Sequence, residues 1–128
     1  MAQAKIILCD TNIIIEYFKG NKSVVDELKV ISESYTYISS ITSAELYYGA
    51  LNKIELQKIK KQLDLISQIP INEAISDIFT QLMIKYSLSH KLSIPDALIA
   101  ATALYYDVEL YTFNKKDFRF ISGIRLYK

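Results

Sequence analysis

The chain has 128 residues, of which 51% are hydrophobic and 23% are charged, with only three glycines and two prolines. This composition is typical of one folded domain spanning residues 1–128, and it excludes disordered and low-complexity proteins. Fifteen basic and 14 acidic residues give a net charge of +1, so any attraction to a polyanion must be local.

Cysteine and histidine are too scarce to build a cross-linked or zinc-stabilised fold. With Cys9 and His90 as the only residues of their kinds, the sequence excludes an internal disulfide and a Cys/His zinc site. No apolar run is long enough to cross a membrane. We therefore expect a cytoplasmic protein in a reducing compartment, without a membrane partner.

The first part of the chain alternates strand and helix patterns. A short apolar run predicts a strand over 5–9, and helical periodicity follows over 11–20 and 24–31. Aromatic and β-branched residues predict a second strand over 35–38, and Thr42 is expected to open the next helix. This β-α-β alternation favours a parallel sheet.

The middle of the chain has two amphipathic patterns that are separated by a proline. Apolar residues recur at helical spacing over 56–66, until Pro70 interrupts the pattern. Asn72 is a good cap for a long helix that fades near His90. These two helices offer apolar stripes that could form a dimer surface.

The last part of the chain combines a buried helix with two strands. Pro95 suits the first turn of a helix whose residues over 97–103 are almost all small or apolar, as packing against a sheet requires. Strands are expected over 109–113 and 124–127. The sequence therefore predicts an α/β fold with a mostly parallel sheet of about five strands.

Four acidic residues stand near the ends of these strands, and each has a simple structural explanation. Asp10 can cap a helix, and Glu45 lies three residues after Thr42, at the spacing of a capping box. Asp96 is favourable in a first helical turn, and Asp117 suits a surface turn. Taken singly, none of the four requires a catalytic role.

The expected topology makes a joint role more attractive. In an open parallel sheet, the strand-to-helix turns meet at the carboxyl edge, so we expect the four acids to converge there. Clustered carboxylates repel one another, and they must take up protons or hold a divalent cation. Oxygen ligands alone point to Mg²⁺ or Mn²⁺.

The same residues fall within four ordered motifs that resemble those of PIN-domain ribonucleases. The length and the third motif look most like the VapC-type toxins of toxin–antitoxin systems. The motifs are Asp10-Thr11-Asn12, Thr42-Ser43-Ala44-Glu45-Leu46, Pro95-Asp96-Ala97-Leu98-Ile99-Ala100-Ala101 and Thr112-Phe113-Asn114-Lys115-Lys116-Asp117.

This resemblance implies a PIN-like three-layer α/β/α fold and an Mg²⁺-dependent endoribonuclease, with Mn²⁺ as a substitute ion. Metal-activated water would cleave RNA and leave a 5′-phosphate and a 3′-hydroxyl. It also implies a cognate antitoxin and a homodimer. The catalytic and metal-binding residues would be Asp10, Glu45, Asp96 and Asp117, and the supporting polar residues would be Thr11, Asn12, Thr112 and Asn114.

Other functions and contacts remain open at this point. Lys115, Lys116 and Arg119 flank Asp117 and are candidates for contacts with RNA phosphates. The same fold could instead serve as a protein-interaction scaffold whose acids only cap helices, or as an RNA-processing nuclease outside a toxin–antitoxin system. A phosphohydrolase of small nucleotides is less favoured, because no glycine-rich phosphate loop is present.

Overall fold

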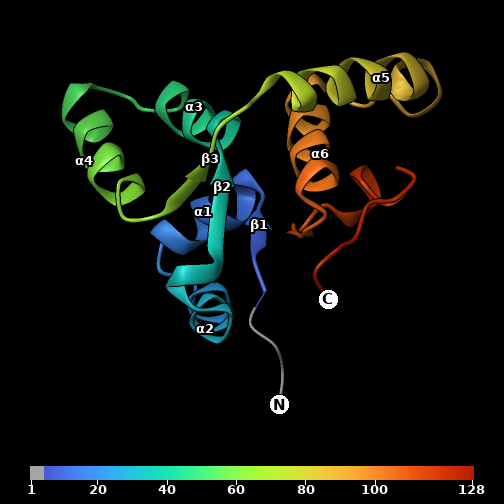
Figure 1. Cartoon of the computed structure of the whole chain (residues 1–128). Helices are drawn as coiled ribbons and strands as arrows, with labels where there is room; N and C mark the ends of the chain where they lie inside the picture. The colour runs from blue at the N-terminus through green and yellow to red at the C-terminus, as the bar shows by residue number, and fades with distance from the viewer. Residues whose placement is uncertain (1–4) are drawn as a thin grey trace.

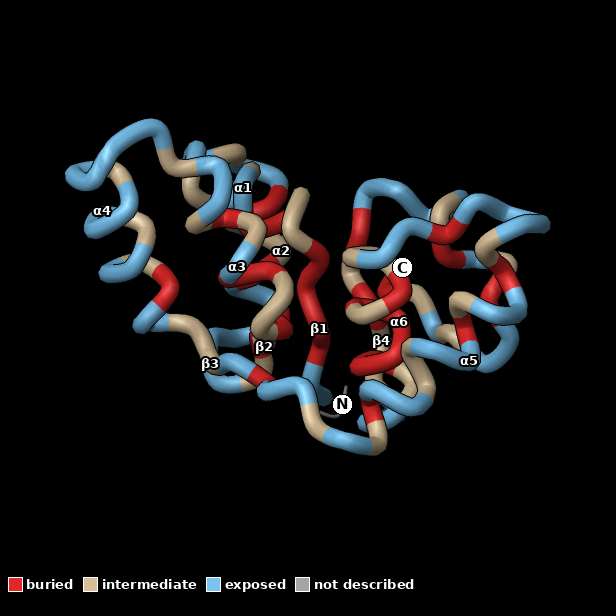
Figure 2. The backbone as a smooth tube through the Cα atoms, turned by 90° about the horizontal axis from the view of Figure 1, so that it is seen from above, coloured by how far each residue is buried: buried red, intermediate tan, exposed pale blue. Residues whose placement is uncertain are grey.

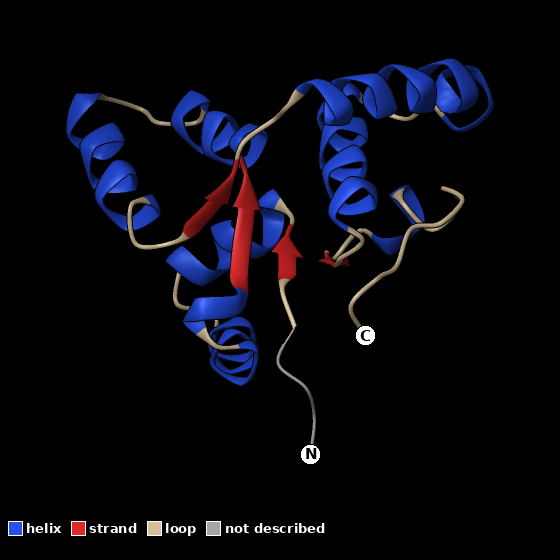
Figure 3. Ribbon diagram, in the orientation of Figure 1, coloured by secondary structure: helices blue, strands red, loops and turns tan. Residues whose placement is uncertain are grey.

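A parallel sheet of four strands organises residues 5–128, the part of the chain that this computed structural model describes. Residues 1–4 of the expected domain lie outside that part. The strands are β1 (Ile7–Cys9), β2 (Thr36–Ser39), β3 (Ser67–Ile69) and β4 (Glu109–Tyr111), in the spatial order β3-β2-β1-β4. All neighbouring strands are parallel, and Figure 3 shows the arrowheads of β1, β2 and β3 pointing the same way.

Six α-helices surround this sheet. They are α1 (Thr11–Phe18), α2 (Lys22–Ile31), α3 (Ser40–Tyr48), α4 (Lys53–Leu63), α5 (Glu73–His90) and α6 (Ile94–Tyr106). Two short 3₁₀ segments, η1 (Glu33–Tyr35) and η2 (Lys115–Asp117), complete the elements. In Figure 1, α1, α2 and α4 lie on one side of the molecule, and α5 and α6 lie on the other.

The core consists of two apolar clusters, one on each face of the sheet. Ile7 and Cys9 pack with residues of α1 and α2, whereas Leu8 packs with residues of α5 and α6. Because successive side chains of a strand point to opposite faces, β1 contributes to both clusters. Figure 2 shows β1 buried along its length. This arrangement confirms the expected three layers.

Several predicted helix boundaries are confirmed by their caps. Asn72 Oδ1 accepts a hydrogen bond from the Ile75 N–H at 2.8 Å, which fixes the start of α5. Pro95 lies in the first turn of α6, where its missing N–H costs no helical hydrogen bond. Asp107 ends α6 in the left-handed conformation that glycine or asparagine usually adopts at this position.

Two expectations about the elements were wrong, and one strand was missed. The segment 124–127 forms only an isolated bridge between Leu126 and Leu110, so the described sheet has four strands. The helical pattern continues to residue 66, but α4 ends at Leu63. The strand that follows, β3, was missed because three residues are too few to show alternation. α3 begins at Ser40 with Ser39 as its cap, and not at Thr42.

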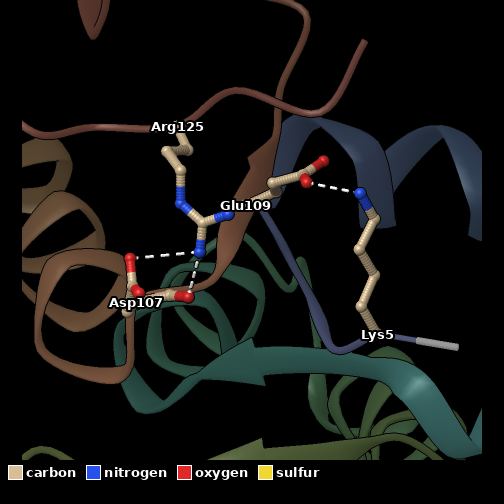
Figure 4. A network of polar contacts seen from close by, with 4 residues as sticks. All are labelled: Lys5, Asp107, Glu109 and Arg125. Atoms are coloured by element: carbon tan, nitrogen blue, oxygen red, sulfur yellow. Dashed lines mark hydrogen bonds and ion pairs between the residues drawn. The ribbon is translucent and has the colours of Figure 1, made fainter. Parts of the chain in front are cut away.

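Oppositely charged side chains connect segments near the amino ends of the strands. Lys5 Nζ lies 2.5 Å from Glu109 Oε2, which joins the segment before β1 to the start of β4. Arg125 Nη2 contacts both the carboxylate and the backbone carbonyl of Asp107, with 3.0 Å to Oδ1 (Figure 4). This edge of the sheet is therefore balanced in charge. Among residues 5–128, no helix is both long and apolar enough to span a membrane.

Candidate functional site

Asp10 is a buried carboxylate between β1 and α1. Its Oδ1 accepts a hydrogen bond from the Thr11 N–H at 2.8 Å, and so it caps α1 as the sequence suggested. Its Oδ2 accepts a second hydrogen bond from the Thr112 hydroxyl at 2.7 Å. Since Thr112 follows β4 directly, these contacts join the carboxyl ends of the two adjacent strands. The side chain is held from both sides, and only 5% of Asp10 is exposed.

Glu45 lies close to Asp10 through Thr11, and it has no capping role. It is in the middle of α3, where the Thr11 hydroxyl donates to its Oε1 at 2.6 Å. The oxygen of that hydroxyl is also 3.1 Å from Thr42 Oγ1. Because Thr11 has one hydroxyl proton, Thr42 is the donor to Thr11 when Glu45 is ionised. The capping-box interpretation of Glu45 is therefore wrong.

Asp96 and Asp117 approach the same edge from the opposite face of the sheet. Asp96 is in the first turn of α6, and its N–H donates to Ser93 Oγ at 3.3 Å. Asp117 ends η2, and its N–H donates to the Asn114 carbonyl at 2.9 Å. The Asn114 N–H donates in turn to Thr112 Oγ1 at 3.0 Å, so η2 is anchored to the hydroxyl that holds Asp10.

Burial and neighbouring acidic charges raise the pKa of Asp10 and of Asp96. Burial raises the pKa of Asp10, the hydrogen bonds from Thr112 and Thr11 lower it, and the charges of Glu45 and Asp117 raise it. Burial also raises the pKa of Asp96 to about 6, and the charges of Asp10, Asp117 and Glu45 act in the same direction. These charge effects place the four acids in one region of the molecule, and their assignment as a site stays a prediction.

The acidic cluster formed by Asp10, Glu45, Asp96 and Asp117 has no ion-pair partner within residues 5–128. None of the ion pairs among residues 5–128 involves any of these four residues. In that same part of the chain, no three His, Cys, Asp or Glu side chains form a group that could hold a metal ion. The cluster is therefore an electrostatically coupled set of oxygens and not a closed metal-binding shell.

Asn12 adds an unusual feature beside this cluster. Its side-chain Oδ1 is buried and has no hydrogen-bond partner. An unpartnered buried acceptor is costly, and native structures contain few of them. Asn12 lies in the first turn of α1, two residues after Asp10. The unused oxygen is thus a further acceptor for a hydrogen-bond donor or a cation at this edge of the sheet.

The basic candidates lie on the segment that carries Asp117. Lys115 and Lys116 belong to η2, Arg119 follows it, and all three are exposed. The Lys115 ammonium group donates to the backbone carbonyl of Lys128. The sequence carries no signal for the contact to Lys128. It named Thr42 only as a helix start and as part of the second motif, and not as a partner of Thr11.

Two cavities formed by residues 5–128 stand out, and none of the four acids lines either of them. The larger, about 490 Å³, lies among residues of α1 and α2 and the segment after α4, and none of the four acids lines it. The smaller, about 270 Å³, is bounded by Thr112, which also donates to Asp10. The hydrogen bonds and charge interactions of the four acids, and not the size of a cavity, indicate where the candidate site lies.

The comparisons with known proteins agree with this architecture. Residues 7–123 match the PIN domain family. The chain is 30% identical to Ribonuclease VapC10 of Mycobacterium tuberculosis over 111 residues, which cover 85% of this chain and 83% of that protein. It is 36% identical to Ribonuclease VapC3 of Methanocaldococcus jannaschii over 93 residues, which cover 72% of this chain and 92% of that protein.

A solved structure supports the same relationship. The toxin–antitoxin complex from Klebsiella pneumoniae contains a chain that is 35% identical to this one, with a TM-score of 0.76. The similarity covers 92% of this chain and 94% of that chain. The ordered motifs, the parallel sheet and these similarities lead to one conclusion: the chain belongs to the PIN-domain family, in its VapC-type branch.

Proposed function

We propose that this chain is a divalent-metal-dependent endoribonuclease that acts as the toxin of a toxin–antitoxin pair. The observation that carries the proposal is the acidic cluster, in which burial and three neighbouring charges raise the pKa of Asp96 to about 6. A cluster of this kind is a typical sign of a functional site. The ribonuclease names of the relatives support RNA as the substrate class.

The donor types suit Mg²⁺, with Mn²⁺ as a substitute, but no three acidic side chains among residues 5–128 lie close enough to form a metal-binding group without moving. All donors are oxygens, their charges are not neutralised by the described residues, and Asn12 Oδ1 is a buried acceptor without a partner. The residues that would hold the ion are Asp10, Glu45, Asp96 and Asp117. When bound, such an ion lowers the pKa of water and stabilises the negative charge that develops on a phosphate.

The chain's own residues then have distinct tasks. Thr112 and Thr11 fix both oxygens of Asp10, so this carboxylate is preorganised at the end of β1. Thr11 also orients Glu45, which suits Glu45 to accept a proton from the attacking water or to position it. Lys115, Lys116 and Arg119 attract the RNA backbone. Cleavage by water leaves a 5′-phosphate and a 3′-hydroxyl.

The test is cleavage of cellular RNA by the purified protein in the presence of Mg²⁺ or Mn²⁺. We expect new RNA 5′ ends that carry a phosphate, and we expect EDTA to prevent their formation. Sequencing of these ends identifies the substrate and the cleavage site. If the wild-type protein leaves cellular RNA intact with either ion, the nuclease proposal is wrong and the scaffold alternative gains support.

We propose a cognate antitoxin as the protein partner. The complex from Klebsiella pneumoniae shows that a related chain occurs in such an assembly. Because the acidic cluster has no counter-charge among residues 5–128, an arginine or lysine from the antitoxin would be attracted to it. Co-expression with the antitoxin should suppress cleavage, and Mg²⁺ should compete with the antitoxin for the cluster.

We also propose a homodimer. On α5, Ile84 and Leu88 are 77% and 90% exposed, and their spacing places them on one face of the helix. An apolar pair of this kind is suited to association between copies. Light scattering should show a dimer for the wild-type protein and a monomer for Ile84→Glu/Leu88→Glu. A wild-type monomer at every protein concentration would contradict the proposal.

A further inference from the structure

A small pocket opens beside the acidic cluster, at the carboxyl end of β4. Its volume is about 270 Å³, slightly below the range of about 300–1,000 Å³ that holds drug-sized ligands. Thr112, which lines this pocket, also donates to Asp10 at 2.7 Å. Thr112 therefore connects the pocket to Asp10, one member of the acidic cluster. The remaining lining residues are Glu27, Tyr111, Phe113, Lys115, Tyr127 and Lys128.

The walls of the pocket are tied together by long-range contacts. The Tyr127 hydroxyl donates to Glu27 Oε2 at 2.7 Å, and Lys128 Nζ lies 3.2 Å from both carboxylate oxygens of Glu27. The Lys115 ammonium group donates to the Lys128 carbonyl. Three distant segments, α2, η2 and the last residues of the chain, are thereby joined around one opening. These contacts connect the residues that line the pocket.

The chemistry of the lining suits a nucleotide. Phe113 is 50% exposed and lies edge-on to Tyr111, with 6.4 Å between ring centroids. Its free face can stack on a base, and such stacking tolerates any base because each has a π-face. Lys115 and Lys128 are the basic groups of the lining, and both already have partners: Lys128 pairs with Glu27, and Lys115 donates to the Lys128 main chain. Both lysines are exposed, and exposed contacts of this kind are weak, so a phosphate can compete for the two ammonium groups.

The two lysines of the pocket also offset the repulsion between the acidic cluster and RNA. Four carboxylates repel a polyanion, so a nuclease must hold the RNA backbone through groups next to the cluster. Lys115 belongs to η2, the segment that ends with Asp117, and so it lies close to both features. The pocket thus offers the attraction that the cluster itself lacks.

We propose that this pocket binds the nucleotide next to the cleaved phosphodiester, with Phe113 stacking on its base and Lys115 and Lys128 contacting its phosphate. The proposal rests on the ribonuclease function and deepens it, because it assigns a substrate-binding subsite to residues outside the acidic cluster. The occupant is single-stranded RNA, whose unpaired bases are free to stack.

The experiment measures binding and cleavage separately. Binding of short fluorescein-labelled oligouridylate and oligoadenylate is followed by fluorescence anisotropy in the Asp96→Asn background, which removes cleavage from the measurement. We expect Phe113→Ala to weaken binding of both probes by about tenfold, and Phe113→Tyr to restore it. Lys115→Gln and Lys128→Gln should each reduce the slope of log K against log salt by about 0.7, the value for one lost phosphate contact.

Matched controls come from surfaces distant from the pocket. Tyr105→Ala removes an aromatic ring that is 44% exposed at the far end of α6, and Lys58→Gln removes a charge on α4. In Figures 1 and 2, α4 lies on the opposite flank of the molecule from the C-terminal segment. Both controls should bind the probes like the parent protein.

The outcomes separate this proposal from the general function. If the wild-type protein cleaves RNA and Phe113→Ala binds and cleaves like the controls, the subsite is wrong and the nuclease stands. If Phe113→Ala instead weakens only the association with the antitoxin, the pocket is a protein-binding site and the proposal is also wrong. Loss of probe binding in Phe113→Ala, with rescue by Phe113→Tyr, supports the subsite.

Discussion

The two edges of the sheet handle charge in opposite ways. At the amino edge, Lys5 pairs with Glu109 and Arg125 pairs with Asp107 (Figure 4). At the carboxyl edge, the four carboxylates of the acidic cluster have no ion-pair partner among residues 5–128, and burial and mutual repulsion raise the pKa of Asp96 and Asp10. Both edges contain acidic residues, so composition does not distinguish them; the arrangement of counter-charges does.

The two edges differ in what their charged residues contribute to the stability of the fold. Paired surface charges contribute little to stability. Uncompensated carboxylates destabilise a fold, and proteins retain them where chemistry requires them. We therefore propose the carboxyl edge as the functional edge, as in other open parallel sheets. The following predictions test the difference between the two edges.

The largest expected difference between the two edges is in the rate of RNA cleavage after one acid at each edge is neutralised. Asp10→Asn keeps a side chain that caps helices well, so the fold should persist. We expect its rate of RNA cleavage to fall by at least about 100-fold, the usual effect of removing a group that stabilises developing charge. Glu109→Gln should cleave at the wild-type rate. Equal rates for Asp10→Asn and the wild-type protein, with circular dichroism unchanged, would exclude a catalytic role for Asp10.

Magnesium should stabilise the wild-type protein through the carboxyl edge. At about 100 times its dissociation constant, an ion that binds only the folded state adds about 2.7 kcal/mol to the free energy of unfolding. Thermal unfolding with and without Mg²⁺ measures this gain. Asp96→Asn should lose most of it, whereas Asp107→Asn should keep it. A gain of equal size in all three proteins would place the ion elsewhere.

The pH dependence of stability should sharpen the contrast further. Without metal, Asp96 binds its proton more tightly in the folded state, where its pKa is raised from 3.8 to about 6. The folded state is therefore penalised as the pH rises from about 4 to about 6, and the penalty is complete above that window. The change in pKa corresponds to at most about 3 kcal/mol. Because solvent reaches part of the side chain, we expect about 1 kcal/mol.

Asp96→Asn provides the measurement for this effect. At pH 7 without metal, this variant should be more stable than the wild-type protein by about 1 kcal/mol, and near pH 4 the two should be alike. Denaturant unfolding at several pH values gives the difference directly. A variant that is less stable than the wild-type protein at pH 7 would mean that Asp96 contributes mainly through the first turn of α6.

Breaking an ion pair at the amino edge should have the smallest effect. Lys5 is exposed, so Lys5→Ala should lower the free energy of unfolding by about 0.2–1 kcal/mol, with less effect at high salt. RNA cleavage should be unchanged. A loss of activity in Lys5→Ala without a loss of stability would show that the two edges are coupled, and the comparison between them would fail.

Local signals in the sequence were sufficient for most of the elements. The cap at Asn72 and Pro95 in the first turn of α6 were readable because capping and proline geometry depend on neighbouring residues. The strand before Asp10 was readable from its apolar run. β3 was not, because three residues do not show a period, and the segment 124–127 has strand-like composition but pairs only through Leu126.

For the candidate site too, some features could be read from the sequence and others depended on the fold. The sequence by itself identified the four acids, and the family resemblance assigned them to ordered motifs. Only the tertiary structure decided that Glu45 contacts Thr11 and does not cap a helix, and that Glu27 meets Lys128 across the smaller pocket. The raised pKa of Asp96 also required the fold, because burial and the charges of distant residues exist only after the chain has brought its segments together.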